Sequence, residues 1–376
     1  RRANKAQANY FEGDALMDIQ KMPKISLHDH LDGGLRTSTM IEIADEIGYK
    51  LPETDPHGLS TWFYQNANSG SLERYLVTFD HTIAVMQKPE HLRRIATETV
   101  LDLHADGVIY AELRWAPEQH QQAGLSLQEA VDAVQDGLEE GMQLVEAMGG
   151  FIRTGQLVSA MRQGNRSLEI AELAVANRND GVVGFDIAGP EKGFPPSMHK
   201  TAFDFLADQL MPTTVHAGEA DGLNSIKDAV VHGRALRLGH GVNIIEDVML
   251  TRTEGDTDLV LLGPVAEWVH DRQIALEIAP SSNLQTGAGE QLGAGITNHP
   301  FDSLYELGFQ VTVNTDNRLQ SATSLTRELE MLSETFDYGV EDLHQFQINA
   351  VEASFQSLDT REELMEMIDS GFAQFE

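Results

Sequence analysis

The first residues whose side chains could take part in chemistry are two histidines, His28 and His30, separated by a single residue. An apolar stretch precedes them and Gly33 and Gly34 follow, which is typical of a strand that runs into a loop. Residues two apart on a strand point to the same side, so both imidazoles face one way. Two neutral imidazoles held like this form half of a zinc site. A His-x-His pair taken alone is more often two ordinary surface histidines.

Three further ligand-type side chains end other apolar runs: His216, His240 and Asp316. Gly218 follows the first of them, and its backbone freedom allows Glu219 to fold back over a pocket. Each of these residues could instead be a polar group that ties down a loop. Their common position at strand ends favours one site at one end of a barrel.

The sequence between these residues alternates between strand-like and helix-like segments. The predicted strands are one that ends at His30, and 108–115, 152–161, 182–188, 213–216, 236–240, 274–279 and 309–314. A capping box, Ser126 with Glu129, begins one of the helices. Such alternation predicts an α/β protein with a parallel sheet, and eight units close a (β/α)8 TIM barrel. An open doubly wound sheet is the alternative.

Two segments exceed what a barrel needs. Residues 38–104 are mostly helical, longer than a crossover after the first strand, and are a candidate lid. Residues 322–376 form extra C-terminal helices. We also expect a polar arm with an amphipathic helix in 1–23 and a polar loop over 251–258. The whole chain, 1–376, is expected to form a single domain.

The composition limits the partners and the metal chemistry. The formal net charge is −33, which repels nucleic acid and anionic lipid, so neither a polynucleotide nor a membrane partner is expected. No run of apolar residues is long enough to span a bilayer, and no signal peptide is visible at the start. Without cysteine, any metal must use histidine and carboxylate ligands, and a reducing cytoplasm is compatible with the sequence. The oligomeric state is not indicated.

Four motifs together resemble a known family. The four motifs are His28-x-His30-Leu-Asp-Gly, His216-Ala-Gly-Glu219, Leu-Gly-His240-Gly and Thr-Asp316. In order and spacing, over about residues 20–360, they are similar to the adenosine deaminase family of the amidohydrolase superfamily. The resemblance implies a (β/α)8 barrel with one Zn²⁺ per chain. It also implies hydrolytic deamination of adenosine and 2′-deoxyadenosine to inosine and deoxyinosine, a purine salvage reaction.

The family pattern further implies a role for each matching residue. The zinc ligands would be His28, His30, His216 and Asp316. Glu219 would be the proton shuttle, and His240 would orient and polarise the zinc-bound water. The implied substrate contacts are His30, Asp32 for the ribose hydroxyls, the backbone of Gly189 for purine N3, Asn317 for N7, and an apolar lid of Leu72, Tyr75, Leu76 and Phe79.

The implied chemistry is consistent with these residue types. Three imidazoles and one carboxylate leave Zn²⁺ able to acidify water toward a pKa of about 7. A neutral Glu219 can protonate ring N1 while C6 is attacked, and burial raises a carboxyl pKa in the required direction. Asn317 departs from the family, which commonly has a second acid there. That acid must be protonated to donate to N7, whereas an amide donates without a pKa shift. The lid residues could also be plain helix core.

The sequence alone leaves other functions open. Deamination of free adenine or of a modified adenosine uses the same chemistry, but Asp32 favours a nucleoside because a free base offers it nothing to hold. Another hydrolase of the superfamily is possible on fold grounds. Two-metal members usually need a carboxylated lysine at a strand end, and no predicted strand ends in lysine. A catalytically inactive binding relative is disfavoured by the intact ligand set and Glu219.

Overall fold

Eight parallel strands form the centre of the protein in a computed structural model that describes residues 2–4, 18–254, 257–289 and 293–375. They make two four-stranded sheets with the orders β2-β3-β4-β5 and β6-β7-β10-β11. Parallel bridges between Asp29 and Asp316 and between Phe185 and Thr213 join both edges and close the ring. The strands are β2 (Lys24–His30), β3 (Val108–Trp115), β4 (Arg153–Met161), β5 (Val182–Ala188), β6 (Thr214–Ala217), β7 (Arg237–His240), β10 (Ala275–Ile278) and β11 (Val311–Val313). The predicted (β/α)8 barrel is confirmed.

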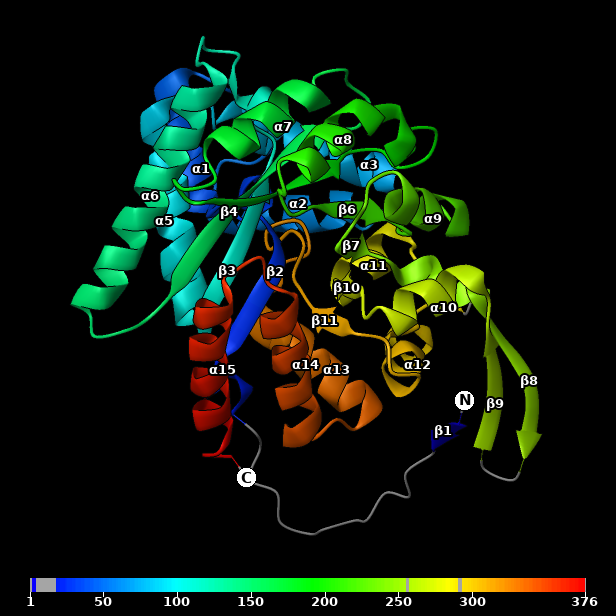
Figure 1. The fold of residues 1–376 in the computed structure, drawn as a ribbon. Helices are drawn as coiled ribbons and strands as arrows, with labels where there is room; N and C mark the ends of the chain where they lie inside the picture. Colours follow the sequence, from blue (N-terminus) through cyan, green and yellow to red (C-terminus); the bar gives the residue numbers. More distant parts are fainter. Residues whose placement is uncertain (1, 5–17, 255–256, 290–292, 376) are drawn as a thin grey trace.

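Helices surround this ring and connect consecutive strands (Figure 1). The connecting helices are α5 (Pro89–Ala105), α6 (Leu127–Ala147), α7 (Ser167–Ala176), α8 (Lys200–Asp208), α9 (Leu223–Val231), α10 (Pro264–Asp271) and α12 (Phe301–Glu306). The predicted capping box is present, since Ser126 and Glu129 bond each other's backbone N–H at the start of α6. Short 3₁₀ turns cover Ile19–Lys21, Leu31–Gly33, Pro117–His120, Pro196–His199, Val242–Asp247 and Ile296–Asn298.

The segment predicted as a lid divides into a crossover helix and a group of shorter helices. Its last helix, α5, packs along α6 and is the crossover between the first two barrel strands. The remaining helices are α1 (Thr37–Ile47), α2 (Pro56–Ala67), α3 (Leu72–Val77) and α4 (Phe79–Ala84). Buried side chains of α2, α3 and α4 form a small apolar cluster separate from the main core: Ala67, Tyr75, Phe79 and Ile83. The C-terminal helices are α13 (Leu325–Phe336), α14 (Val340–Ala353) and α15 (Leu358–Phe372).

The polar loop predicted over 251–258 is wrong. β8 (Val248–Glu254) and β9 (Thr257–Leu262) form an antiparallel hairpin there, which projects from the barrel, and β1 (Arg2–Asn4) pairs with β9 (Figure 1). A hairpin outside the barrel sheets needs no apolar alternation along its length, so the polar sequence there resembles a loop. The helix predicted in 1–23 lies mostly outside the described residues. A further helix, α11 (Pro280–Thr286), was not predicted.

The barrel interior contains paired charges as well as apolar side chains. Arg237 contacts Glu112 and Glu277 at 2.6 Å each, and all three side chains are buried. Arg114 also contacts Glu277, at 2.7 Å. This charged network reaches the floor of the site described below. Among the described residues, no helix combines the length and apolar character that crossing a bilayer requires.

Candidate active site

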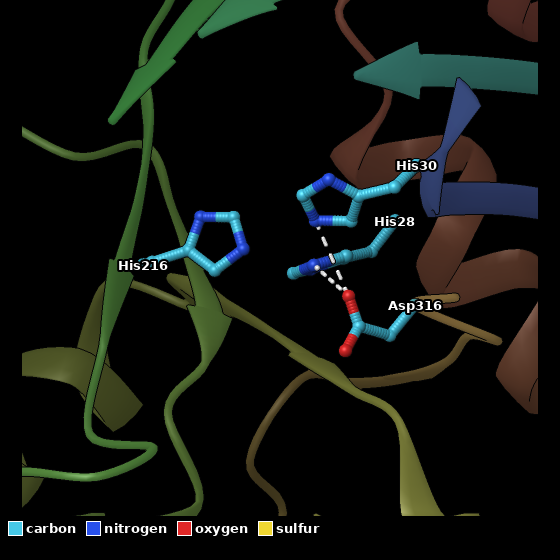
Figure 2. A group of neighbouring side chains, drawn as sticks. All are labelled: His28, His30, His216 and Asp316. Carbon is cyan, nitrogen blue, oxygen red and sulfur yellow. Dashed lines mark ion pairs between the residues drawn. The ribbon is translucent and has the colours of Figure 1, made fainter. Parts of the chain in front are cut away.

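Four ligand-type side chains converge at the carboxyl ends of the barrel strands. His28 and His30 come from β2, His216 from β6 and Asp316 from the segment after β11, and all four are buried. One candidate ligand atom from each lies within 4.8 Å of the others. Nε2 of His28 and Nε2 of His30 lie 3.3 and 3.2 Å from Asp316 Oδ1, with the His216 imidazole facing them from across the site (Figure 2).

The outer ring nitrogens of these histidines hold each imidazole in one orientation. Nδ1 of His28 lies 2.9 Å from Glu277 Oε2. Burial alone would raise the pKa of Glu277, but Arg114 and Arg237 hold that pKa well below its usual range. The Glu277 carboxylate can therefore only accept, so His28 donates from Nδ1 and directs the Nε2 lone pair into the site.

His216 is held in the same way. Its Nδ1 lies 3.0 Å from Ile187 O and 3.0 Å from a carboxylate oxygen of Asp186. Burial lowers the pKa of His216 to about 4, although Asp186 favours the protonated form. A neutral His216 with its proton on Nδ1 leaves Nε2 free as a ligand.

These residues fit a divalent metal ion. Three imidazole nitrogens and one carboxylate oxygen suit Zn²⁺ and neighbouring transition metals. Nε2 of His28 is buried and has no hydrogen-bond partner among the described residues. Burial lowers the pKa of His30, but the neighbouring carboxylates of Asp316 and Asp32 outweigh burial and raise that pKa to about 10. Without a cation, Asp316 thus draws a proton onto His30, and a metal would take the place of that proton.

Glu219 lies beside this cluster on the loop after β6. Gly218 precedes it with φ of 75°, and a Cβ at Gly218 would come 2.5 Å from Ile226 Cδ1, so the turn requires glycine. The Glu219 carboxyl is buried. Burial, followed by the charges of Asp316 and Glu191, raises its pKa well above the usual range. Glu219 therefore favours the protonated form that a proton donor needs.

Glu191 holds that loop from behind, and sequence reasoning missed it. Its carboxylate accepts hydrogen bonds from the backbone N–H of residues 218, 219, 220 and 221 at 2.6, 3.1, 2.7 and 2.9 Å. It also accepts one from the Ser225 hydroxyl at 2.5 Å. The available signal was a carboxylate two residues after Gly189, at the end of a strand.

His240 completes the polar group at the end of β7. Its Nε2 lies 3.7 Å from Glu219 Oε2 and 4.0 Å from Asp316 Oδ2. Burial lowers the pKa of His240 well below its usual range, so the imidazole is neutral. His240 and Asp316 both have positive φ values, 64° and 57°. Such backbone is uncommon for residues other than glycine and often accompanies functional sites.

A cavity of about 430 Å³ opens above these groups. Apart from His28, which lies beneath its floor, every site residue named from the sequence lines the wall: His30, Asp32, Leu72, Tyr75, Leu76, Phe79, Gly189, His216, Glu219, His240, Asp316 and Asn317. Asp32 Oδ1, Tyr75 Oη and Asn317 Oδ1 are buried without a hydrogen-bond partner among the described residues. No sequence pattern pointed to the other wall residues, among them Gln119, Ser159, Met161 and Gln163.

The chain is similar over most of its length to proteins of a known family. The family model described as adenosine deaminase matches residues 23–371. The chain is 51% identical to adenosine deaminase 1 of Streptomyces coelicolor over 358 residues, which cover 95% of this chain and 88% of that protein. It is 50% identical to adenosine deaminase of Mycobacterium ulcerans over 357 residues, or 94% and 96% of the two chains.

Solved structures share the fold. An N6-mAMP deaminase from Arabidopsis has a TM-score of 0.77 and 25% identity, covering 94% of this chain and 99% of that one. An adenine deaminase from Arthrobacter aurescens has a TM-score of 0.78 and 21% identity, covering 93% and 98%. With a family match over most of its length and relatives at half identity, the chain belongs to the adenosine deaminase family.

Proposed function

We propose that the protein hydrolyses adenosine and 2′-deoxyadenosine to inosine and deoxyinosine, with release of ammonia. The observation that carries the proposal is the convergence of three imidazoles and Asp316 beside the buried Glu219 in one cavity. The half-identical relatives that are named adenosine deaminase support the same reaction.

The metal in this proposal is one Zn²⁺ per chain, held by His28, His30, His216 and Asp316. The donor set supports it, since imidazole nitrogen and carboxylate oxygen are typical zinc ligands and the chain has no cysteine. When bound, the ion activates a water molecule for attack on C6 of the purine.

Glu219 moves protons in this reaction. Attack on C6 breaks the aromaticity of the ring, so N1 must gain a proton as the new C–O bond forms. A protonated Glu219 can give that proton to N1, and the resulting carboxylate can then carry a proton from the attacking oxygen to the leaving amino group. The raised pKa of Glu219 supports its role as the donor. His240 orients the attacking oxygen from the other side.

The wall of the cavity holds the nucleoside. Asp32 Oδ1 is buried and makes no hydrogen bond among the described residues, with His30 Nδ1 3.6 Å away, so a ribose hydroxyl can donate to it. The Gly189 backbone contacts purine N3, and the Asn317 amide donates to N7. The lid side chains of α3 and α4, Leu72, Tyr75, Leu76 and Phe79, cover the base.

A nucleotide substrate is a second candidate, because the Arabidopsis neighbour is an N6-mAMP deaminase. The charge of the cavity argues against it. Besides Glu219, four acidic side chains line the described wall, at residues 32, 73, 80 and 316, and no lysine or arginine does. A phosphate group there would meet negative charge without a cationic partner.

We further propose that residues 1–376 act as one catalytic domain, with the helical segment of about 38–104 over the pocket and C-terminal helices of about 322–376. We place the protein in the cytoplasm, in purine salvage. The cysteine-free chain, which is compatible with a reducing environment, supports that compartment.

A substrate panel tests the proposal. Adenosine, 2′-deoxyadenosine, adenine, AMP and N6-methyl-AMP are compared by ammonia release from the metal-loaded protein. We expect kcat/KM for the two nucleosides to exceed that for the other compounds by at least about 10²-fold, because the site is built to hydrogen-bond the sugar. A preference for adenine or for a nucleotide would contradict the nucleoside assignment, and ligand binding without turnover of any compound would indicate an inactive relative.

A further inference from the structure

A line of buried polar groups runs from His240, away from the cavity, to the start of α12. His240 Nδ1 lies 2.9 Å from Nδ2 of Asn283 on α11. Asn283 Oδ1 lies 3.3 Å from Nε2 of His299, whose Nδ1 lies 3.1 Å from the backbone nitrogen of Phe301. All four residues are at most 5% exposed, so water does not compete for these bonds.

The direction of every bond in this line follows from its far end. The backbone N–H of Phe301 can only donate, so Nδ1 of His299 must accept. Burial lowers the pKa of His299 to about 4, so the ring is neutral and its one proton is on Nε2. That N–H donates to Asn283 Oδ1.

The Asn283 amide is thereby fixed in one orientation. Its Nδ2–H donates to Nδ1 of His240, which must accept with its lone pair. An imidazole whose Nδ1 accepts has its one proton on Nε2, so the His240 proton lies on the nitrogen nearest Glu219 and Asp316.

The opposite orientation of the Asn283 amide would break the line of hydrogen bonds. If the amide were reversed, its Nδ2–H would face His299 and require a lone pair on Nε2. The His299 proton would then be on Nδ1, directed at the Phe301 N–H only 3.1 Å away. Two buried donors, the Phe301 N–H and the His299 Nδ1–H, would lose their bonds, and an unsatisfied buried donor is costly.

We infer that Asn283 and His299 are positioning residues that set the tautomer of His240, so that it presents an N–H donor, and not a lone pair, to the cavity. The inference rests on the proposed function in so far as His240 acts on the deamination. An Nε2–H can donate to the oxygen that adds to C6, but it cannot take a proton from it. Proton transfer is therefore left to Glu219.

Asn283→Asp tests this inference through catalysis. The exchange keeps the shape and replaces the donor by an acceptor, so His240 is expected to move its proton to Nδ1 and lose the donor in the cavity. We expect kcat to fall at least about 10-fold, with a smaller change in KM and unchanged metal content. The matched control is Asn177→Asp on the outer surface of the barrel, where a buried Asn donates to Leu173 O and Gln128 Oε1. The control is expected to lose stability and keep kcat, and an equal fall in kcat in both variants would overturn the inference.

Nitrogen NMR of the metal-loaded protein observes the His240 tautomer directly and does not depend on catalysis. The protein is labelled with ¹⁵N-histidine, and the His240 signals are assigned by their absence in His240→Asn. We expect the proton on Nε2 in the parent and on Nδ1 in Asn283→Asp. A parent His240 with its proton on Nδ1 would overturn the inference and leave the proposed function intact. A parent that does not deaminate adenosine would remove the proposed function, while the spectrum would still decide the tautomer.

Discussion

Arg318 donates a hydrogen bond from Nε to Asp29 Oδ2 across 2.7 Å, and the pair is largely buried. Asp29 stands between His28 and His30, and Arg318 lies two residues after Asp316. Backbone bonds run beside the ion pair, from His30 N to Asp316 O at 2.8 Å and from Asp316 N to His28 O at 2.9 Å. The pair therefore closes the barrel at the point where the candidate metal ligands meet.

Removal of the Arg318 guanidinium should weaken the closure of the barrel. Arg318→Met keeps an apolar stem but leaves the buried Asp29 carboxylate unpaired, so we expect a loss of about 3–5 kcal/mol in the free energy of unfolding. Urea unfolding of the metal-loaded protein measures it. The double variant Asp29→Asn with Arg318→Met removes both charges and should regain part of the loss. Parent-like stability in Arg318→Met would show that the ion pair does not stabilise the closure.

Glu219→Gln separates proton transfer from binding. The amide keeps the shape and a hydrogen bond but cannot exchange a proton, so kcat should fall by about 10²–10⁴-fold with unchanged metal content. The parent should lose activity as pH rises, because burial raises the Glu219 pKa and the active, protonated form ionises only above that raised value. The alkaline decline should be absent in Glu219→Gln. A variant as fast as the parent would exclude Glu219 as the proton carrier.

Asp32→Ala tests the sugar contact. Loss of a charged hydrogen bond of about 1.5–3 kcal/mol should lower kcat/KM for adenosine about 10- to 10²-fold. Metal content should not change, and any slow turnover of free adenine should stay at the parent rate. If adenosine is handled as well as by the parent, Asp32 does not hold the ribose.

Asn317 tests how the base is read. Its amide lies against Gly33, where a Cβ would come 2.0 Å from Asn317 Oδ1. Asn317→Leu removes the donor to N7 and should slow adenosine turnover, measured as kcat/KM. Asn317→Asp should retain turnover only while the new acid is protonated, so its rate should weaken as pH rises. Equal rates for Asn317→Leu and the parent would remove this loop from the base-recognition site.

The barrel was predictable because its strands are buried on both faces. Val108–Trp115 and Val182–Ala188 have the bounds predicted from the sequence, since a parallel strand reads as a nearly continuous apolar run. The convergence of His28, His30 and Asp316 followed from their common position at strand ends. Gly34 is explained only by the structure, because a Cβ there would come 2.2 Å from Arg318 Nη2.

The structures that escaped prediction are polar ones. α11 is seven residues long and rich in Ser, Asn, Gln and Thr, so it has no apolar period, yet Ser282 on it donates to Asp316 Oδ2 at 2.6 Å. The buried Arg114 and Glu277 contradict the rule that charges stay at the surface. Their contact with each other, and those with Asp186 and Arg237, make burial tolerable. Sequence patterns reveal burial through the spacing of apolar residues. These polar and charged side chains are buried because they pair with residues far away in the chain, and no local pattern shows such pairs.

The most direct test of the account is zinc content and adenosine turnover measured together on one preparation. The purified protein should hold about one zinc per chain. Chelation should abolish ammonia release from adenosine, and added Zn²⁺ should restore it in proportion to the metal bound. His216→Ala should lose metal and activity together, while His344→Ala, a histidine on α14 whose Nε2 lies 2.9 Å from Asp369 Oδ1, should keep both. A metal-free protein with full activity, or a zinc-loaded protein that leaves adenosine intact, would contradict the account.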